Sequence, residues 1–276
     1  MPELPEVEVV RRGVARALKG KTVRRVTVLR PQMLVHTSPR QLQRRLKGRA
    51  LRRVRRRGKV LMLDFGDHML LVHLGMTGLL LAQSRADPLP SHPRVILDFE
   101  DNSRLVFDDT RTFGGVELVQ TDRLADAHML RNVGPDVYAN SFDGAALLRS
   151  FEGHRRDIKT HLLDQTHFSG LGNIYACEAL HRARISPRKR CHRITPEQAR
   201  RLGQAIRRVL RAGIEAGGTT FSDYRTPEGR EGQFRRMLRV YGREGRRCKR
   251  PGCPGTIRRI VQAQRSTFYC PACQRG

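Results

Sequence analysis

The sequence predicts an α+β protein with more than one domain. A chain of 276 residues corresponds to about two domains of ordinary size. Short apolar strands with tight turns fill the first half, helical patterns follow a polar connection, and four of the six cysteines lie near the end. These observations predict an antiparallel sandwich or barrel, then a helical region, then a small metal-binding finger.

The first half begins with a helix and continues as strands. Apolar side chains recur at helical spacing over residues 3–19 and Gly20 follows, so a helix is predicted there. A short helix is predicted over 38–47, where Ser38-Pro39 provides a start. Strands are predicted over 22–30, 60–63, 69–72, 94–99 and 104–107.

The second half is predicted to be helical. Residues 121–141 are polar and include Gly134-Pro135, so they are a candidate linker. Helices are predicted over 142–151, 157–165, 173–183 and 195–216. Residues 217–233 are rich in glycine and polar side chains and too long for a simple turn, which makes them a candidate functional loop.

The net charge of +28 predicts a polyanionic partner. It comes from 54 Lys and Arg against 26 Asp and Glu, and 47 of the basic residues are arginine. Residues 40–57 contain no acid, and apolar Leu42 and Leu46 are interleaved with the arginines, so this segment can fold with a basic face. A solvated surface in an arginine-rich proteome explains part of the excess. Self-repulsion of this size, however, destabilises a compact state unless a ligand neutralises it.

The sequence shows no signal for export or membrane insertion. No apolar run approaches the roughly 18 residues that a membrane-spanning helix needs. The N-terminal segment MPELPEVEVV carries acids where a signal peptide needs basic residues. We therefore expect an intracellular, cytoplasmic protein with no membrane partner.

The cysteines predict a zinc ribbon. The spacing is Cys248-x4-Cys253, sixteen residues, then Cys270-x2-Cys273. Two close pairs around a hairpin, with strands over 257–263 and 266–269, supply the four thiolates of a structural zinc ion, and four protein ligands leave no open position for water. Two disulfides are the alternative, which a reducing compartment disfavours.

The N-terminus is a candidate reactive group. Removal of Met1 would leave Pro2 with a free secondary amine at the positive end of a helix, which lowers an amine's pKa. Such an amine attacks aldehyde-like carbon and forms an iminium. Glu3 and Glu6 are neighbouring candidate acids. The alternative is ordinary helix capping, because Met-Pro starts and early glutamates are common.

Seven segments in order resemble formamidopyrimidine-DNA glycosylases. They are MPELPEVE at the start, RRGK at 56–59, HLGMTG at 73–78, DDTRTFGG at 108–115, GLGNIYACEAL at 170–180, VYGREG at 240–245 and QRSTFYCPAC at 264–273. The similarity covers essentially the whole chain. Any one motif is weak, but seven in sequence are specific.

The resemblance implies an α+β multidomain fold. An N-terminal antiparallel β-sandwich flanked by helices would span 1–120, followed by a linker over 121–141. A helix–two-turn–helix domain would span 142–233 and include a lesion-capping loop over 217–233, and a zinc finger would span 234–276. The family excises oxidised purines, chiefly 8-oxoguanine and formamidopyrimidines, and then cuts the DNA by β,δ-elimination.

The resemblance also implies roles for single residues. Pro2 would be the nucleophile, Glu3 an acid or base near the deoxyribose ring oxygen, Lys59 a proton-transfer group and Arg265 a grip on the lesion phosphate linked to the second elimination. DNA contacts would come from His73, Met76, His92, Arg111, Phe113, Lys159, Asn173 and Tyr241. Zinc would be held by Cys248, Cys253, Cys270 and Cys273. Met76, Arg111 and Phe113 would fill the space left when the damaged base is flipped out.

Two features depart from the family pattern. The usual Asp-Pro-Arg-Arg-Phe-Gly is replaced by Asp109-Thr110-Arg111-Thr112-Phe113-Gly114, which leaves the opposite-base preference open. The first cysteine pair has four intervening residues rather than two, so a wider knuckle is expected, with zinc binding retained.

Three functions compete at this point. The first is the oxidised-purine glycosylase and lyase, acting as a monomer on damaged double-stranded DNA in the bacterial nucleoid. The second is an endonuclease VIII-like enzyme for oxidised pyrimidines, which the segment 217–233 argues against because that group generally lacks it. The third is a non-catalytic zinc-finger protein that binds nucleic acid; Pro2, Glu3 and Lys59 argue against it, because binding alone needs none of them.

Overall fold

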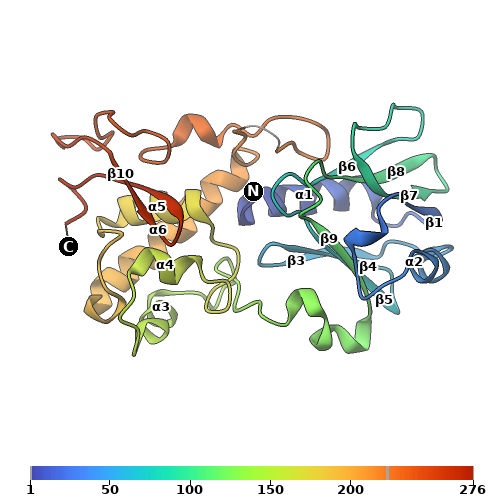
Figure 1. The fold of residues 1–276 in the computed structure, drawn as a ribbon, viewed down its shortest axis with the longest axis horizontal. Coiled ribbons are helices and arrows are strands. Elements are labelled where there is room, and N and C mark those ends of the chain that lie inside the picture. The colour runs from blue at the N-terminus through green and yellow to red at the C-terminus, as the bar shows by residue number, and fades with distance from the viewer. Residues whose placement is uncertain (1, 222–223, 276) are drawn as a thin grey trace. The chain divides into compact units, whose positions relative to one another are not determined.

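The computed structural model describes residues 2–221 and 224–275, which form two compact units. Unit 1 comprises Met1–Asn132 together with Ala216–Gln233, and unit 2 comprises Val133–Glu215 together with Phe234–Gly276. Figure 1 shows the strands of unit 1 in blue to green and the helices of unit 2 in yellow to orange.

Unit 1 is built on two sheets. Their strands are β1 Val23–Val28, β2 Leu34–Val35, β3 Arg53–Arg57, β4 Val60–Asp64, β5 His68–His73, β6 Leu79–Ser84, β7 Pro93–Phe99, β8 Ser103–Asp108 and β9 Gly115–Gln120. One sheet has the order β1-β7-β8-β6 and the other the order β2-β9-β5-β4-β3. Every pairing is antiparallel except the two-residue β2–β9 pair. One hydrophobic core, to which both sheets contribute, confirms the predicted sandwich.

Two helices lie against strands at the ends of these sheets. Helix α1, Leu4–Leu18, buries Val7, Val10 and Val14 and contacts β3 and β6, the last strand of each sheet. Helix α2, Pro39–Leu46, contacts β1, the first strand of its sheet. Covering the end strands protects unpaired backbone groups from pairing with another chain.

Unit 2 contains four α-helices in its described part, and then a hairpin. The helices are α3 Gly144–Phe151, α4 Ile158–Leu163, α5 Asn173–Ala183 and α6 Pro196–Glu215. Helix α6 packs on α3 and α5, and α5 also packs on α4. The hairpin strands β10 Arg258–Gln262 and β11 Arg265–Tyr269 are antiparallel, and β11 lies against α5. The predicted helices and strands of both units are confirmed to within two residues at each end.

Four strands of unit 1 were not predicted one by one: β2, which has only two residues, and β3, β6 and β9, whose patterns are atypical. Strand β3 has the sequence Arg-Val-Arg-Arg-Arg, in which only Val54 is fully buried. Strand β6 is largely half-buried, and β9 buries only its first three residues. Strands β3 and β6 end their sheets, where one side has no partner strand and alternation is weak.

The two units divide the chain differently from the expected domains. Residues 121–132 of the expected linker belong to unit 1, where Glu117 accepts hydrogen bonds from the backbone of His128 and Met129 at 2.9 and 2.8 Å. The segment Ala216–Gln233, expected in the helical domain, also belongs to unit 1. Its backbone bonds to β6, since Ala82 N donates to the Pro227 carbonyl at 3.2 Å.

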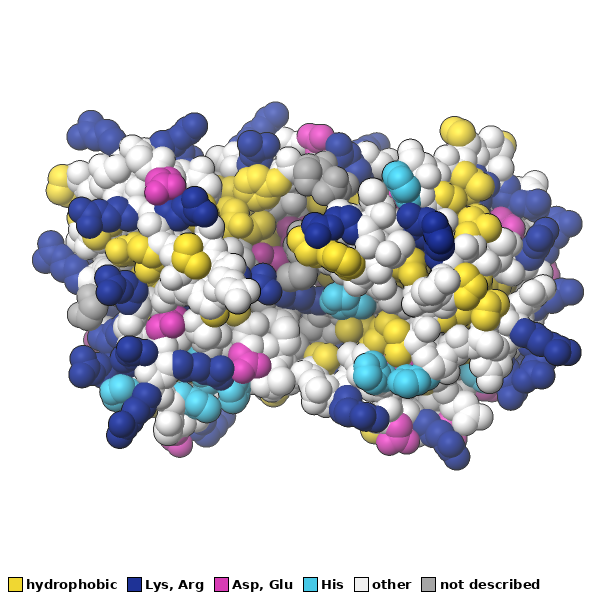
Figure 2. All heavy atoms as spheres, in the orientation of Figure 1, with side chains coloured by type: hydrophobic (Ala, Val, Ile, Leu, Met, Phe, Trp, Pro, Cys, Tyr) yellow, Lys and Arg dark blue, Asp and Glu magenta, His cyan; other side chains and the backbone are white. Residues whose placement is uncertain are grey.

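Across the described chain, none of the helices combines the length and apolar composition that crossing a membrane requires. Lysine and arginine side chains spread over the visible face, whereas acidic side chains are sparse there (Figure 2).

Candidate functional site

The N-terminal end of α1 is built around two buried carboxylates. Glu3 is the residue before the helix and is 3% exposed, and Glu6 in the first turn is 2% exposed. The Glu6 carboxylate accepts a hydrogen bond from Glu3 N at 2.8 Å, and the two residues form a reciprocal capping box. Pro2 is buried beside them in sequence. The helix capping that the sequence allowed as an alternative is therefore present. It fixes the position of Glu3, which is next to the candidate nucleophile Pro2.

Glu6 also binds the segment 216–233. Its other carboxylate oxygen accepts from Thr219 N at 2.7 Å, and its carbonyl accepts from the Tyr224 hydroxyl at 3.4 Å. Gly218 has φ +88°, and a Cβ there would lie 3.0 Å from Glu6 Cγ and 2.8 Å from Tyr224 Cε1. The glycine is needed both for this backbone conformation and for the close approach. One carboxylate thus connects the start of α1 with the expected lesion-capping loop.

Lys59 lies at the turn between β3 and β4, and it is buried. Gly58 in this turn has φ +57°, and the Arg56 guanidinium donates to its carbonyl at 2.6 Å. The lysine side chain is 9% exposed. His73 is paired with Val60, the residue after Lys59. Burial and the nearby positive charge of Lys59 both lower the pKa of His73.

Glu8 fastens α1 to this hairpin. Its carboxylate lies 3.4 Å from Arg56 Nε and 2.8–2.9 Å from the guanidinium groups of Arg11 and Arg12. Burial alone would raise the pKa of Glu8, but hydrogen bonds from Arg11 and Arg12, with the charges of Arg11 and Arg56, lower it to about 2. The ionised Glu8 carboxylate therefore connects the N-terminal helix α1 with the β3–β4 hairpin that carries Lys59.

The three predicted void-filling residues are exposed on unit 1. Met76 is 42% exposed and Phe113 is 57% exposed, which is unusual for large apolar side chains. The Arg111 guanidinium carbon lies 4.6 Å from the Phe113 ring centroid, within cation–π range. A Cβ on Gly75 would lie 2.4 Å from the backbone of Phe113, so this glycine lets the loops 73–78 and 109–114 touch.

Asp109 holds these loops together and was missed by sequence reasoning. It is fully buried, and its carboxylate accepts from Thr77 Oγ1 at 2.5 Å and from Gly114 N at 2.8 Å. The Thr77 hydroxyl in turn accepts from Arg111 N at 3.1 Å. The available signal was an acid directly before the exposed residues, in a chain poor in acids.

His92 lies at the base of the same loop. Its backbone N donates to Asp108 at 2.6 Å, and its carbonyl accepts from Asp109 N at 3.1 Å. Its ring lies 3.4 Å from the Thr110 hydroxyl. Thr110 stands where the family has proline, and this contact uses its side chain.

In unit 2, Lys159 and Asn173 meet at strand β11. Lys159 is fully buried, and its ammonium donates to Thr267 Oγ1 at 2.7 Å. Asn173, the first residue of α5, donates to the Ser266 carbonyl at 2.9 Å, while its buried Oδ1 has no partner in the structure. Lys159 was expected to reach a phosphate. In this structure its side chain packs inward and supports the hairpin next to Arg265, and its contact with a phosphate stays a prediction.

Arg265 is exposed where the hairpin turns. The two residues before it, Ala263 and Gln264, have φ +45° and +58°, the left-handed region that a two-residue turn between antiparallel strands requires. Val261, one strand position before the turn, is 67% exposed. The tip is thus a stiff, projecting element with a positive charge.

Tyr241 is positioned by a buried carboxylate on α5. Glu178 is 3% exposed and accepts hydrogen bonds from the backbone nitrogens of Arg239, Val240 and Tyr241 at 2.9–3.0 Å. Burial raises the pKa of Glu178, although these three bonds oppose the shift. The Tyr241 ring makes an edge contact with Phe268 at 5.0 Å.

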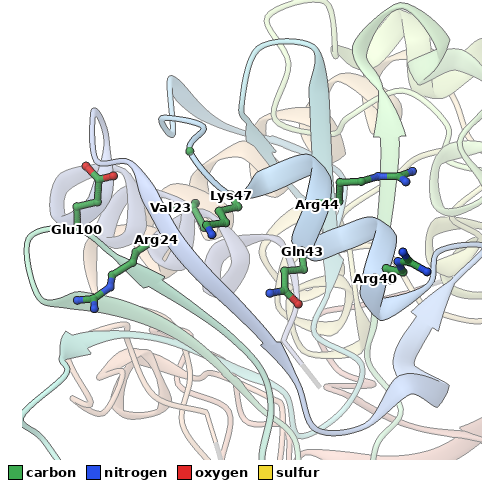
Figure 3. Close-up of a pocket in the computed structure, with 8 residues that line it drawn as sticks. Val23, Arg24, Arg40, Gln43, Arg44, Lys47 and Glu100 are labelled. Carbon is green, nitrogen blue, oxygen red and sulfur yellow. The ribbon is translucent and has the colours of Figure 1, made fainter.

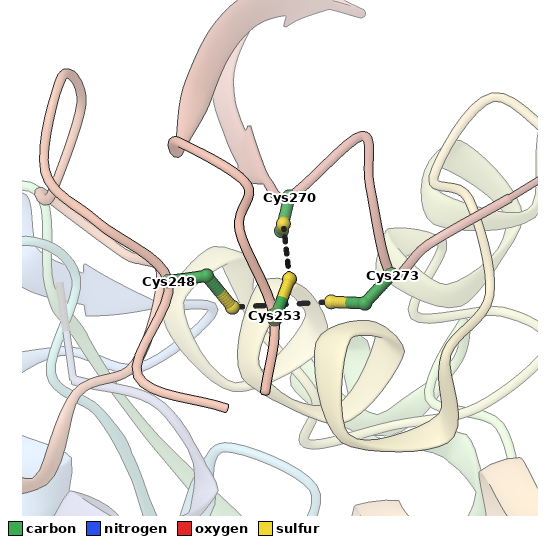
Figure 4. A group of neighbouring side chains, drawn as sticks. All are labelled: Cys248, Cys253, Cys270 and Cys273. Atoms are coloured by element: carbon green, nitrogen blue, oxygen red, sulfur yellow. Dashed lines mark hydrogen bonds between the residues drawn. The ribbon is translucent and has the colours of Figure 1, made fainter. Parts of the chain in front are cut away.

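The four predicted zinc ligands converge (Figure 4). The sulfurs of Cys248, Cys253, Cys270 and Cys273 all lie within 4.8 Å of one another, and none is in a disulfide. The Cys248–Cys273 and Cys253–Cys270 sulfur distances are 3.9 and 3.6 Å. Two thiolates on one tetrahedral zinc are about 3.8 Å apart, so this group fits a single structural zinc ion, and the wider first knuckle does not prevent it.

A basic pocket outside the seven motifs is lined by helix α2 (Figure 3). Its volume is about 670 Å³, and Arg40, Arg44 and Lys47 line it together with Arg24 of β1. Leu42 and Leu46 of the same helix are fully buried. The segment 40–57 therefore has the basic face that its interleaved apolar residues predicted.

Comparisons with known proteins cover the whole chain. The family model for the formamidopyrimidine-DNA glycosylase N-terminal domain matches residues 1–116, and the model for that family's H2TH domain matches 133–225. A model for the zinc finger found in FPG and IleRS matches 245–276. Formamidopyrimidine-DNA glycosylases of Cereibacter sphaeroides and Beijerinckia indica are 45% and 43% identical to this chain over 100% of both lengths.

Solved structures agree with the sequence relatives. A complex between the Lactococcus lactis Fpg and an abasic-site DNA is 33% identical, with a TM-score of 0.91 over 100% of both chains. A complex of an inhibited LlFpg with DNA containing N7-benzyl-Fapy-dG is 33% identical to this chain, with a TM-score of 0.90 over 100% of both chains.

Proposed function

The chain belongs to the formamidopyrimidine-DNA glycosylase family, and on that premise we propose that it is a bifunctional DNA glycosylase and AP lyase of base excision repair. Its substrates are oxidised purines, chiefly 8-oxoguanine and formamidopyrimidines, in double-stranded DNA. Full-length similarity to glycosylases of this name favours oxidised purines over the pyrimidine-directed and non-catalytic alternatives.

The observation that carries the proposed chemistry is the buried pair Glu3 and Glu6 at the start of α1. Helix α1 begins at Leu4, two residues after Pro2, so the Pro2 amine experiences the positive end of the helix dipole. That field favours the uncharged amine, which is the nucleophilic form.

Pro2 nitrogen forms a bond to C1′ of the flipped nucleotide as the bond from C1′ to the damaged base breaks. The base leaves with a proton. Glu3 donates a proton to the ring oxygen as the sugar opens, which leaves an iminium between C1′ and nitrogen. The Glu3 carboxylate, ionised by the ring opening, accepts a C2′ proton as the 3′ phosphate leaves. A C4′ proton then passes to Lys59 as the amine base while the 5′ phosphate leaves, and water hydrolyses the remaining iminium to free Pro2.

Lys59 serves as the proton-transfer group of the proposed active site. An amine can lose its proton at this position, whereas arginine, the common basic residue of the chain, cannot. His73 contributes a neutral imidazole next to it, because its lowered pKa keeps the ring uncharged.

DNA is held by two sets of residues. Met76, Arg111 and Phe113 occupy the space left by the flipped base and support the orphaned cytosine. Asn173, Arg265, Tyr241 and His92 contact the phosphate backbone, and Lys159 acts by supporting the hairpin that carries Arg265. Zinc, held by the four cysteines, stiffens that hairpin and takes no part in the chemistry.

Borohydride trapping tests the function directly. The duplex contains one 8-oxoguanine opposite cytosine, and an undamaged duplex and one with an oxidised pyrimidine are run beside it. We expect a covalent adduct with the first duplex that maps to Pro2, and cut products with phosphate on both ends. If an adduct forms only with the oxidised-pyrimidine duplex, the assignment to oxidised purines is wrong. If no adduct forms with any lesion, the protein is a non-catalytic nucleic-acid-binding protein.

Two variants separate the amine from the fold. Pro2→Gly is expected to keep part of the adduct through its primary amine, and a blocked N-terminus is expected to abolish it. Pro5→Ala, in the first turn of α1, is the matched control and should trap at the parent level. An active enzyme with a blocked N-terminus would remove Pro2 as nucleophile.

We further propose that the protein acts as a cytoplasmic monomer on the bacterial nucleoid. The curated relatives are bacterial, and solved relatives bind DNA. Size-exclusion chromatography with light scattering, with and without duplex, measures the oligomeric state; a stable dimer would contradict the proposal.

A further inference from the structure

Unit 2 holds a second cluster of metal-ligating side chains, outside the four cysteines. His154 lies in the loop after α3, His161 in the last turn of α4, and His167 in the loop before α5. One ring nitrogen of each lies within 4.8 Å of those of the other two. The rings of His161 and His167 stack with centroids 4.4 Å apart, and His154 is 4.9 Å from both.

The spacing is close to that of a metal site. Two imidazole nitrogens on one tetrahedral zinc are about 3.4 Å apart, so the nitrogens need to close by no more than about 1.4 Å. The stacked rings of His161 and His167, whose planes differ by 14°, must also rotate so that both nitrogens face the ion. Asp164 adds a carboxylate: its Oδ2 lies 3.8 Å from His167 Nε2. Three imidazoles with one carboxylate form a nitrogen and oxygen donor set that suits zinc, nickel or copper.

The hydrogen bonds of His161 decide which of its ring nitrogens can bind a metal. Arg156 donates to His161 Nδ1 at 3.1 Å, which leaves Nε2 as the ligand atom; its present contact is Ser150 Oγ at 3.3 Å.

An ion can reach the cluster from solvent, because two of its three histidines are partly exposed. His161 is fully buried, whereas His154 and His167 are partly exposed. Arg156 is the nearby positive charge that opposes a cation, and its guanidinium is already bonded to Asp164 at 3.0 Å. The site thus has a buried anchor and two outer ligands that an entering ion can meet first.

We propose that His154, His161 and His167 bind one divalent transition-metal ion of the zinc class, with Asp164 as the fourth donor. This ion is additional to the zinc of the cysteine cluster and plays no part in the glycosylase chemistry. It ties the loops on both sides of α4 to the helix. In the second of these loops, Gln165 accepts from Gly170 N at 3.0 Å, so the ion stabilises the segment that leads to Asn173.

Metal content of the full-length, zinc-saturated protein tests the proposal. We expect two zinc ions per chain and a zinc-dependent rise in Tm. The double variant His154→Gln/His167→Gln, which leaves buried His161 in place, should bind one zinc and lose the Tm response. His192→Gln, an exposed histidine of the same unit, is the matched control and should still bind two.

Cobalt substitution distinguishes the two sites. The sulfur-to-cobalt charge-transfer band reports the cysteine cluster and should be unchanged in the double variant, while the cobalt bound without sulfur is lost. One zinc per parent chain at saturation would overturn the proposal. Equal loss in His192→Gln would also overturn it, because it would show dispersed binding to surface histidines.

Discussion

Two exposed elements of this molecule, one in each unit, are each held by a buried charged side chain, but the two charges have opposite sign. In unit 1 the loop with Arg111 and Phe113 rests on buried Asp109, whose carboxylate collects hydrogen bonds from Thr77 and Gly114. In unit 2 the hairpin tip with Arg265 rests on buried Lys159, whose ammonium bonds Thr267. The loop is held by a buried anion and the hairpin by a buried cation. In both, a charged group that solvent does not reach holds the residues beside the exposed side chain.

The largest effect is expected from breaking the anionic support. Asp109→Ala leaves the Thr77 hydroxyl and the Gly114 amide without their buried acceptor, so we expect a loss of about 2–4 kcal/mol in unfolding free energy. Asp101→Ala removes an aspartate that is 46% exposed and bonds Ser103, and it should cost well under 1 kcal/mol. Urea denaturation measures both. Equal costs would show that burial of Asp109 carries no special weight.

The cationic support offers a sharper test, because Lys159 was expected from sequence to contact DNA. Lys159→Met should lower stability by about 1–2 kcal/mol, since Thr267 loses its buried partner, and should leave the salt dependence of DNA binding unchanged. Arg265→Gln should instead reduce the slope of log K against log salt by about 1. Thr267→Val is the matched control and should reproduce Lys159→Met. A reduced slope for Lys159→Met alone would place the ammonium on a phosphate.

The smallest effect concerns backbone strain in the two elements. Thr112 in the loop has φ +54° and Gln264 in the hairpin turn has φ +58°. Left-handed backbone is costly for side chains with a Cβ, most of all for β-branched ones, so Thr112→Gly should raise the unfolding free energy by about 0.5–1 kcal/mol and Gln264→Gly by less. Thermal denaturation measures the change, and Thr110→Gly, without positive φ, should destabilise by about 1 kcal/mol. A destabilised Thr112→Gly would mean that its side chain contributes more than strain costs.

The periodic elements could be predicted from sequence because their signals are local. The apolar spacing of α1 and the cysteine spacing of the finger each identify their own structure within a short segment, 26 residues from Cys248 to Cys273 for the finger. The assignment of 216–233 to unit 1 could not be predicted in this way. It depends on a Glu6 carboxylate 213 residues earlier in the chain, and on glycines that permit the approach.

The candidate site shows the same limit. The motifs identified Met76, Phe113 and Arg265 as site residues, and the structure shows all three exposed, while their roles remain predictions. The buried carboxylates that hold the loop of Phe113 and the backbone at Tyr241, Asp109 and Glu178, had no periodic signal, because a single acid has no period. Burial of Lys159 was equally invisible, since a helix of six residues is too short for its inward face to be identified.

The shared carboxylate of Glu6 makes the N-terminus and the segment 216–233 thermodynamically interdependent. The Glu6 carboxylate accepts from both Glu3 N and Thr219 N. When one of these bonds forms, the Glu6 side chain is already restricted to one rotamer, so the second bond forms at a lower cost in conformational entropy. By reciprocity, whatever orders the loop increases the population of the aligned N-terminus, and whatever engages the N-terminus orders the loop to the same extent. Under the proposed function, capping of the damaged base by this segment and alignment of Pro2 for attack on its sugar are therefore coupled through one carboxylate.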